Sequence, residues 1–310
     1  MPGIGTPERI GSTRRSVQST MMVTVATYNI HRCIGRGRRV DPWRTLDVIE
    51  ALDADVIALQ EVEPPAVPSP ATITLLRRLA GLGYEPVLGP TIRSHRHSYG
   101  NVLLSRLPVR RRTRIDLSHT GREPRGLIDV RLKLKDRLQP GASPAIGPML
   151  ERIMGRLWGG LHTEERPQRW WPTPLARGPE LRCLATHLGL GMEERRRQIA
   201  QIAERLDLAG TEAAARLGHG TDGAGQSPLV LLGDFNEWRA RHQRLAPLQA
   251  RLEATPALPT WPARWPLLAL DRIWTRGGLR LAELEVIRTP LARRASDHLP
   301  LRARLWLPEQ

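Results

Sequence analysis

The chain has 310 residues, which is enough to bury a large core as one big domain or as two, and its formal net charge is +16. This charge invites a nucleic acid or an anionic membrane as partner, but nearly all of it is arginine, and an ordinary solvated basic surface explains it as well. No run approaches the roughly 18 apolar residues that span a bilayer, and Cys33 and Cys183 supply neither a disulfide framework nor a zinc site. We therefore expect reduced thiols and a monomeric cytoplasmic protein, with peripheral membrane contact as an option.

The first half of the chain begins with two apolar strands. Residues 22–28 have strand composition and end at Asn29. A helix is expected to start at Pro42, a residue type favoured at the first helical position. The run 56–59 is typical of a buried strand, and it ends in Gln60-Glu61. Each of the two strands therefore delivers a polar side chain at the same end.

Between these strands and residue 135 we expect a helix and three further strands. His95 and His97 have a spacing that metal ligands can adopt, but no cysteine or third close histidine joins them, which favours a solvated basic loop. Asn101 can contact a phosphate or simply cap a strand. The predicted elements are a Pro-rich turn and helix within 64–83 and strands at 102–105, about 108–117 and 125–135.

The domain boundaries follow from polar and Pro/Gly-rich stretches. Residues 1–20 lack the apolar run of a signal peptide, so we expect a disordered tail followed by one domain over 21–308. Residues 136–180 are rich in Pro and Gly and interrupt the strand pattern. Within them, apolar residues mark one face of a short helix at 148–161, and Trp170-Trp171 follows. A surface insertion is favoured over a substrate lid or a membrane contact through 148–171.

The second half repeats the pattern of strands that end in polar groups. Residues 181–186 form a strand that ends at His187, and a helix is expected over 193–208. The apolar run 228–232 ends in Gly233-Asp234-Phe235-Asn236, where the Gly supplies a turn. Downstream we expect a helix from Asn236 to about Leu252, a strand at 268–274 with Asp271 near its start, and a closing strand at 301–307 after Ser296-Asp297-His298.

Polar groups at strand boundaries are the main functional signal. Asp234 and Asn236 alone are typical of an ordinary Asx turn. Six independent strands that each place an acid, amide or imidazole at a boundary are difficult to obtain from stability alone. Oxygen ligands suit Mg²⁺, and the scarcity of His and Cys argues against zinc. A carboxylate beside a second histidine can orient and partly deprotonate an attacking water. The groups are Asn29, Glu61, His187, Asp234, Asn236, Asp271, Asp297 and His298.

As a set, these motifs resemble the endonuclease/exonuclease/phosphatase superfamily with the DNase I-like fold. The match covers 21–307 in the family's order. The resemblance implies an α/β four-layer sandwich of two mostly antiparallel β-sheets flanked by helices, with an active site at one edge of the sheets. The motifs are Tyr28-Asn29, Leu59-Gln60-Glu61-Val62, Gly100-Asn101-Val102-Leu103-Leu104-Ser105, Thr186-His187-Leu188, Gly233-Asp234-Phe235-Asn236, Leu270-Asp271-Arg272-Ile273 and Ser296-Asp297-His298.

The resemblance also implies roles for individual residues. Asn29, Glu61 and Asp297 are expected at Mg²⁺, with Mn²⁺ as a substitute. Thr186-His187 resembles the branch with DNase I, sphingomyelinases, inositol-phosphate phosphatases and tyrosyl-DNA phosphodiesterases, rather than the exonuclease III-type repair enzymes. The expected catalytic residues are His187, Asp234, Asn236, Asp271 and His298, and the expected substrate-binding residues are Asn101 and Arg125.

The expected activity is Mg²⁺-dependent hydrolysis of a phosphodiester or phosphomonoester by in-line attack of water. The substrate is expected to be a nucleic acid or a phospholipid head group, and basic charge does not choose between them. One alternative is a phospholipid- or sphingomyelin-type phosphodiesterase instead of a nuclease. A second is a non-catalytic binding module on the same fold, which is disfavoured because every site position carries a chemically competent residue.

Overall fold

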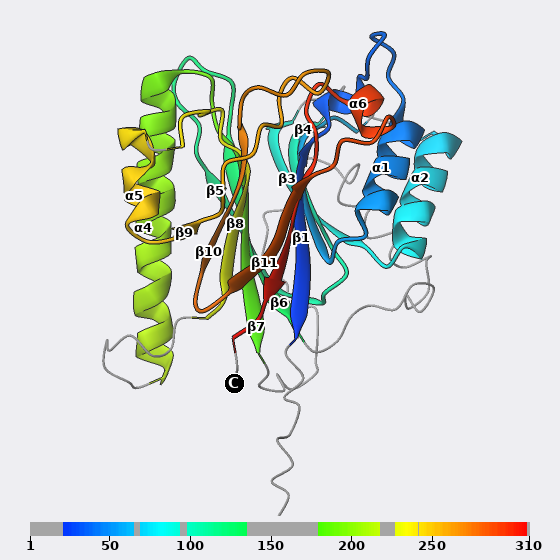
Figure 1. Cartoon of the computed structure of the whole chain (residues 1–310). Helices are drawn as coiled ribbons and strands as arrows, with labels where there is room; N and C mark the ends of the chain where they lie inside the picture. The colour runs from blue at the N-terminus through cyan, green and yellow to red at the C-terminus, as the bar shows by residue number, and fades with distance from the viewer. Residues whose placement is uncertain are drawn as a thin grey trace, which may run out of the picture.

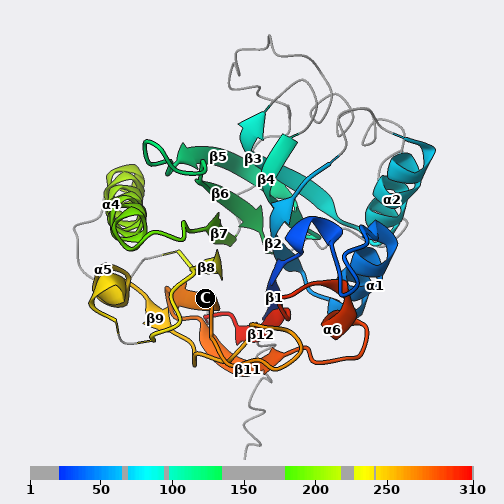
Figure 2. The ribbon, with the colours of Figure 1, turned by 90° about the horizontal axis from the view of Figure 1, so that it is seen from above.

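Two six-stranded β-sheets pack face to face, and helices cover both outer surfaces (Figures 1 and 2). The computed structural model describes residues 21–64, 69–93, 98–134, 179–217, 227–240 and 242–308. The predicted four-layer sandwich is confirmed. The predicted tail at 1–20, the loop with His95 and His97, and the helix at 148–161 lie outside the described residues.

The two sheets share one design. Each contains a single parallel pair at its centre, β1 with β2 in the first sheet and β7 with β8 in the second, and all other neighbours are antiparallel. In order across the first sheet the strands are β11 (Arg280–Val286), β12 (Leu301–Trp306), β1 (Met22–Asn29), β2 (Val56–Val62), β4 (Ser98–Ser105) and β3 (Glu85–Arg93). In the second they are β5 (Val109–Asp116), β6 (Gly126–Lys133), β7 (Glu180–His187), β8 (Leu229–Asp234), β10 (Asp271–Arg276) and β9 (Glu253–Ala254).

Helices form the two outer layers, as the view from above shows (Figure 2). α1 starts at Pro42 because the Asp41 side chain accepts the N–H of Arg44, and it ends where Asp53 adopts a left-handed conformation. No helix among the described residues has both the length and the apolarity to cross a bilayer. The helices are α1 (Pro42–Leu52), α2 (Pro70–Gly81) and α6 (Ala292–Ala295) beside the first sheet and α4 (Met192–Leu217) and α5 (Ala246–Gln249) beside the second, with short 3-10 turns at His31–Cys33 and Gln243–Leu245.

The main core lies between the sheets. Val25 and Val56 from the first sheet pack in one cluster with Val130 and Leu232 from the second, and all four side chains are fully buried. Burial of each such side chain is worth roughly 1.5–3 kcal/mol. Separate clusters lie beneath α1 and beneath α4. The strand ends are therefore held by a rigid apolar interior on which polar groups can be placed accurately.

Several elements differ from the sequence-based expectations: the sequence pattern does not predict β9 or β11, and α4 extends to Leu217, beyond the expected helix at 193–208. The predicted helix from Asn236 to about Leu252 is wrong, because Asn236 has a φ of +50° and only the turns at 243–249 are helical. The pattern does not predict β3, since it contains Pro and Gly, but β3 is an edge strand and tolerates them. The strand expected at 268–274 begins only at Asp271.

Candidate active site

The candidate site lies where the carboxyl ends of the two parallel pairs face each other. Asn29 ends β1 and Asp234 ends β8, and the two side chains meet across the gap between the sheets. Asp271, the first residue of β10, pairs with Asp234 in the strand register. This end is the upper one in Figure 1, opposite the C-terminus.

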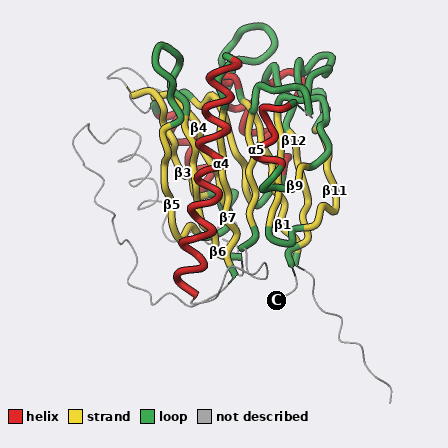
Figure 3. Tube along the Cα trace, turned by 90° about the vertical axis from the view of Figure 1, so that its left-hand side faces the viewer, coloured by secondary structure: helices red, strands yellow, loops and turns green. Residues whose placement is uncertain are grey.

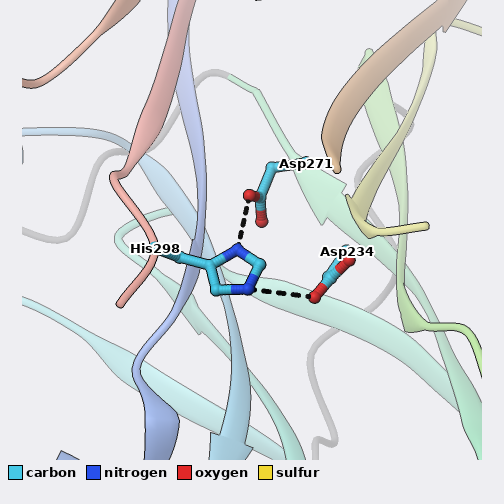
Figure 4. Close-up of side chains that lie close together, drawn as sticks. All are labelled: Asp234, Asp271 and His298. Carbon is cyan, nitrogen blue, oxygen red and sulfur yellow. Dashed lines mark hydrogen bonds and ion pairs between the residues drawn. The ribbon is translucent and has the colours of Figure 1, made fainter. Parts of the chain in front are cut away.

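His298 lies between two buried carboxylates (Figure 4). Its Nδ1 is 2.8 Å from Oδ2 of Asp271, and its Nε2 is 3.7 Å from Oδ2 of Asp234. All three residues are at most 5% exposed. Burial alone lowers the pKa of His298, but Asp271 and Asp234 outweigh burial and raise it to about 10. The ring is therefore protonated, as an imidazolium ion, at neutral pH.

Asn29 joins the two sheets at the site. Its Oδ1 accepts the backbone N–H of His31 at 3.0 Å, which fixes the orientation of the amide. Its Nδ2 then donates to Oε1 of Glu61 and to Oδ2 of Asp234, each at 3.1 Å. Glu61 has a φ of +56° in a bulge of β2, and a bulge of this kind re-aims the side chain. The amide therefore holds a carboxylate from each sheet in place.

His187 is in the opposite protonation state to His298. The amide of Asn236 donates to the carbonyl of Leu188 at 2.8 Å, so its nitrogen also faces Nε2 of His187 at 3.2 Å. Nε2 is then the acceptor, and the proton of the ring is on Nδ1. Burial lowers the pKa of His187 to about 3, although Asp234, at 3.5 Å, acts to raise it. One carboxylate is thus flanked by a charged and a neutral imidazole.

The loop before β12 is fastened to the end of β1. The hydroxyl of Ser296 donates to the carbonyl of Asn29 at 2.8 Å and accepts the N–H of His298 at 3.2 Å. Asp297 is half exposed, lies 3.5 Å from Nδ1 of His31, and accepts Nε1–H of Trp261 at 3.1 Å. Sequence reasoning did not identify the roles of Ser296 and Trp261, because neither residue type signals a site by itself.

Of the two expected substrate-binding residues, Arg125 interacts electrostatically with the site, through its effect on His187. Asn101 donates its amide to the carbonyl of Gly126, the first residue of β6, at 3.3 Å, and its contact with a phosphate stays a prediction. Arg125 is buried, pairs with Glu123, and contributes to the low pKa of His187. Tyr99 was not predicted. Burial first, and then Glu61 and Glu123, raise the pKa of its hydroxyl, while a hydrogen bond with Arg125 opposes them.

A second layer of charges stands behind Asn236. Glu237 is buried and accepts a hydrogen bond from Arg244 at 2.8 Å, with Arg195 3.8 Å away. Arg195 in turn donates to the carbonyls of Gly189 and Leu190, at 3.1 and 2.6 Å. The loops after β7 and β8 are therefore clamped together. A glutamate in a turn gave no sequence signal of this network.

The oxygen donors at the site fit a hard divalent cation. Asp234, Asp271 and His298 have ligand atoms within 4.8 Å of one another, but a protonated imidazole has no lone pair to offer a metal. Glu61 is a better candidate, because among the described residues its one hydrogen bond is to the amide of Asn29 and no cation pairs with it. Asp297 adds a half-exposed carboxylate. Carboxylate and amide oxygens suit Mg²⁺ or Mn²⁺ better than zinc.

Comparisons with known proteins identify the family and the fold. The chain is 26% identical over 300 residues to YbhP, an uncharacterized protein of Escherichia coli strain K12, covering 91% of this chain and 96% of YbhP. An endonuclease/exonuclease/phosphatase structure from Beutenbergia cavernae aligns with a TM-score of 0.61 and 20% identity over 92% of this chain and 72% of that one. The human nocturnin catalytic domain with bound sulfate aligns with a TM-score of 0.58 and 18% identity over 92% and 94%. The model of the endonuclease/exonuclease/phosphatase family matches residues 26–298, and the chain belongs to this family.

Proposed function

We propose that the protein is a Mg²⁺- or Mn²⁺-dependent hydrolase that cleaves phosphodiester bonds by in-line attack of water on phosphorus. One observation carries the proposal: His298 is buried between Asp271 and Asp234, beside the pair formed by Asn29 and Glu61. A structural role alone does not require a buried imidazolium ion at the meeting point of two sheets. Phosphoryl transfer is accelerated by a fixed positive charge near the phosphate oxygens and by a carboxylate that can accept a proton from water.

Each residue of the site has its own role in the proposed reaction. Asp234 is held by Nδ2 of Asn29 and by the backbone N–H of Asn236, and it accepts a proton from the attacking water. His298 donates from Nε2 to the phosphate oxygens, where negative charge develops as the new P–O bond forms; the bond to the leaving oxygen breaks with its electron pair on that oxygen, which takes a proton from solvent. Asp271 keeps that ring charged and oriented. A divalent cation bound through the Glu61 carboxylate, which Nδ2 of Asn29 orients, with the half-exposed Asp297 as a second candidate ligand, would supply Lewis acidity at the phosphate.

His187 supports placement on the Thr-His branch of the family, and we include this in the proposal. Its neutral Nε2 faces Asn236 and lies 3.5 Å from Asp234, so the ring touches the groups that meet the phosphate. In this arrangement the neutral ring of His187 orients the groups that meet the phosphate, while the ring of His298 carries the extra proton.

The direct test is hydrolysis of bis-p-nitrophenyl phosphate with Mg²⁺ or Mn²⁺. We expect turnover by the wild type and a loss of at least about a hundredfold in kcat/KM for Asp234→Asn and for His298→Gln. Thermal unfolding of each variant shows whether the fold is retained. If the wild type is no faster than these folded variants, the protein is a binding module on this fold and the hydrolase proposal is wrong.

A further inference from the structure

Exposed apolar side chains gather at the end of the molecule that holds the site. Seven of the ten large hydrophobic residues that are exposed in the described chain lie in segments at this end, although single exposed apolar residues are normally scattered. We call these seven the apolar rim: Val40 (63% exposed), Trp43 (38%), Leu190 (76%), Met192 (66%), Trp238 (50%), Trp265 (69%) and Leu267 (75%).

The segments that carry the apolar rim are tied directly to the site. Segment 31–43 reaches it through His31 and Asp297, and segment 188–192 through the bond from Asn236 to Leu188. Trp238 follows Asn236 by two positions, and segment 260–270 is fixed by Trp261 on Asp297. Figure 1 shows these connections together at the upper end, above the ends of β1 and β8, and Figure 3 shows the same loops at the top in side view.

The exposed side chains of the apolar rim are held outward by ordered backbone. In segment 260–270 the chain forms a bridge between Trp261 and Leu268, and the N–H groups of Trp265 and Leu267 bond to the carbonyls of Pro262 and Trp261 at 3.0 and 2.8 Å. This hairpin therefore presents Trp265 and Leu267 at a fixed tip. Their exposure is a property of the fold.

The same segments are strongly cationic. In 31–43, 188–192, 236–240 and 260–270, and in the neighbouring segment 287–297, all of them described, two carboxylates are substantially exposed: Asp41, whose side chain is 41% exposed and pairs with Arg44, and Asp297 at the site itself. Glu193, the next residue after one of these segments, is paired with Arg196 and Arg197. The exposed arginines are Arg32, Arg36, Arg38, Arg39, Arg239, Arg264, Arg288 and Arg294. The apolar rim is therefore surrounded by positive charge and matches a surface that is apolar inside and anionic outside.

A lipid bilayer fits this chemistry better than a nucleic acid does. Single strands bind through aromatic rings that stack on bases, but Val40, Leu190, Met192 and Leu267 have no ring to stack. Aliphatic side chains gain free energy on entering hydrocarbon, tryptophan favours the membrane interface, and arginine reaches anionic head groups from there. We propose that the apolar rim docks the protein on an anionic phospholipid surface, so that the site faces phosphoester groups at the level of the head groups. The second half of this proposal rests on the proposed hydrolase function, whereas docking does not.

The test uses the full chain and vesicles of phosphatidylglycerol and phosphatidylcholine in equal parts, with pure phosphatidylcholine for comparison. We expect co-sedimentation with the anionic vesicles, and a partition coefficient at least about tenfold lower for Trp265→Ser/Leu267→Ser, since two exposed anchors are lost. Leu281→Ser is the matched control, because Leu281 is 40% exposed in β11, away from the apolar rim. It should bind like the wild type.

The outcomes separate docking from catalysis. The double variant should hydrolyse bis-p-nitrophenyl phosphate at the wild-type rate, because neither residue belongs to the catalytic group. Equal vesicle binding by the double variant and the wild type overturns the docking proposal. The docking proposal is also overturned if the wild type does not bind vesicles but binds a single-stranded oligonucleotide through Trp265. Vesicle binding without any hydrolysis leaves docking intact and contradicts only the hydrolase function.

Discussion

The charge on His298 depends on Asp271, and Asp271→Asn tests that dependence without changing the size of the side chain. The Nδ1 to Oδ2 contact of 2.8 Å is fully buried. The rise of the His298 pKa from 6.5 to about 10 corresponds to about 5 kcal/mol in favour of the protonated ring. With an amide in place of the carboxylate, burial favours the uncharged ring, and Asp234, whose Oδ2 lies 3.7 Å from Nε2, remains to oppose it. We expect the pKa of His298 to fall toward or below 6.5.

The consequence for activity is a change in both rate and pH dependence. Because the wild-type pKa is raised, the ring stays charged through neutral pH and loses its proton only as the pH rises through about 10. We expect kcat/KM for bis-p-nitrophenyl phosphate to stay level between about pH 7 and 9 in the wild type. In Asp271→Asn it should be lower on the order of 10²–10⁴-fold at pH 7.5, with the descending limb moved toward acid.

The role of Asp271 can be tested against a variant of an exposed carboxylate far from the site. The control is Asp207→Asn, which removes the exposed ion pair between Asp207 on α4 and Arg251. It should leave the pH dependence of kcat/KM unchanged. Titration of the ring protons of His298 by NMR measures its pKa directly. If Asp271→Asn retains the wild-type rate and the wild-type alkaline limb, then Asp271 does not hold the charge on His298, and the assigned roles of both residues are wrong.

Three further predictions concern the metal, acid stability and the clamp behind the site. Glu61→Gln should raise the Mg²⁺ concentration for half-maximal activity at least about tenfold, measured by metal titration of the rate. The pKa of His187 in the folded protein is depressed to about 3, so the free energy of unfolding should fall as the pH drops from about 6.5 toward 3. In His187→Gln, the midpoint of urea unfolding should depend less steeply on pH over this range. An unchanged pH dependence would count against a buried neutral ring. Glu237→Ala leaves Arg195 and Arg244 without their buried carboxylate and should cost about 3–5 kcal/mol in the free energy of unfolding, whereas the exposed Glu283→Ala should cost within about 0.5 kcal/mol.

The sequence predicts the strand ends of the site well and the support around them poorly. Asn29, Glu61, His187 and Asp234 lie at the ends of strands, and either a continuous apolar run or a composition rich in β-branched and apolar residues identifies each of these strands from local sequence. The contacts of Glu237 and Ser296 depend on residues far along the chain, so no local pattern contains them. The segment after Asn236 has leucines at helical spacing, but the positive φ of Asn236 turns the chain away from a helix. The apolar rim was invisible for the same reason, since exposure is a property of the folded chain.

The hydrogen bond from Asn29 to Asp234 crosses from one sheet to the other, so the distance between the sheets bears directly on the geometry of the site. The separation of the two sheets sets the distance between their carboxylates, and that separation is fixed by interior residues such as Val25 and Leu232. The packing of the apolar interior therefore helps to set the distances between the polar groups of the active site. Loops beyond the strand ends are free of this constraint. A change in the packing between the sheets would therefore alter the spacing of the site carboxylates, whereas a change in a loop beyond the strand ends would not.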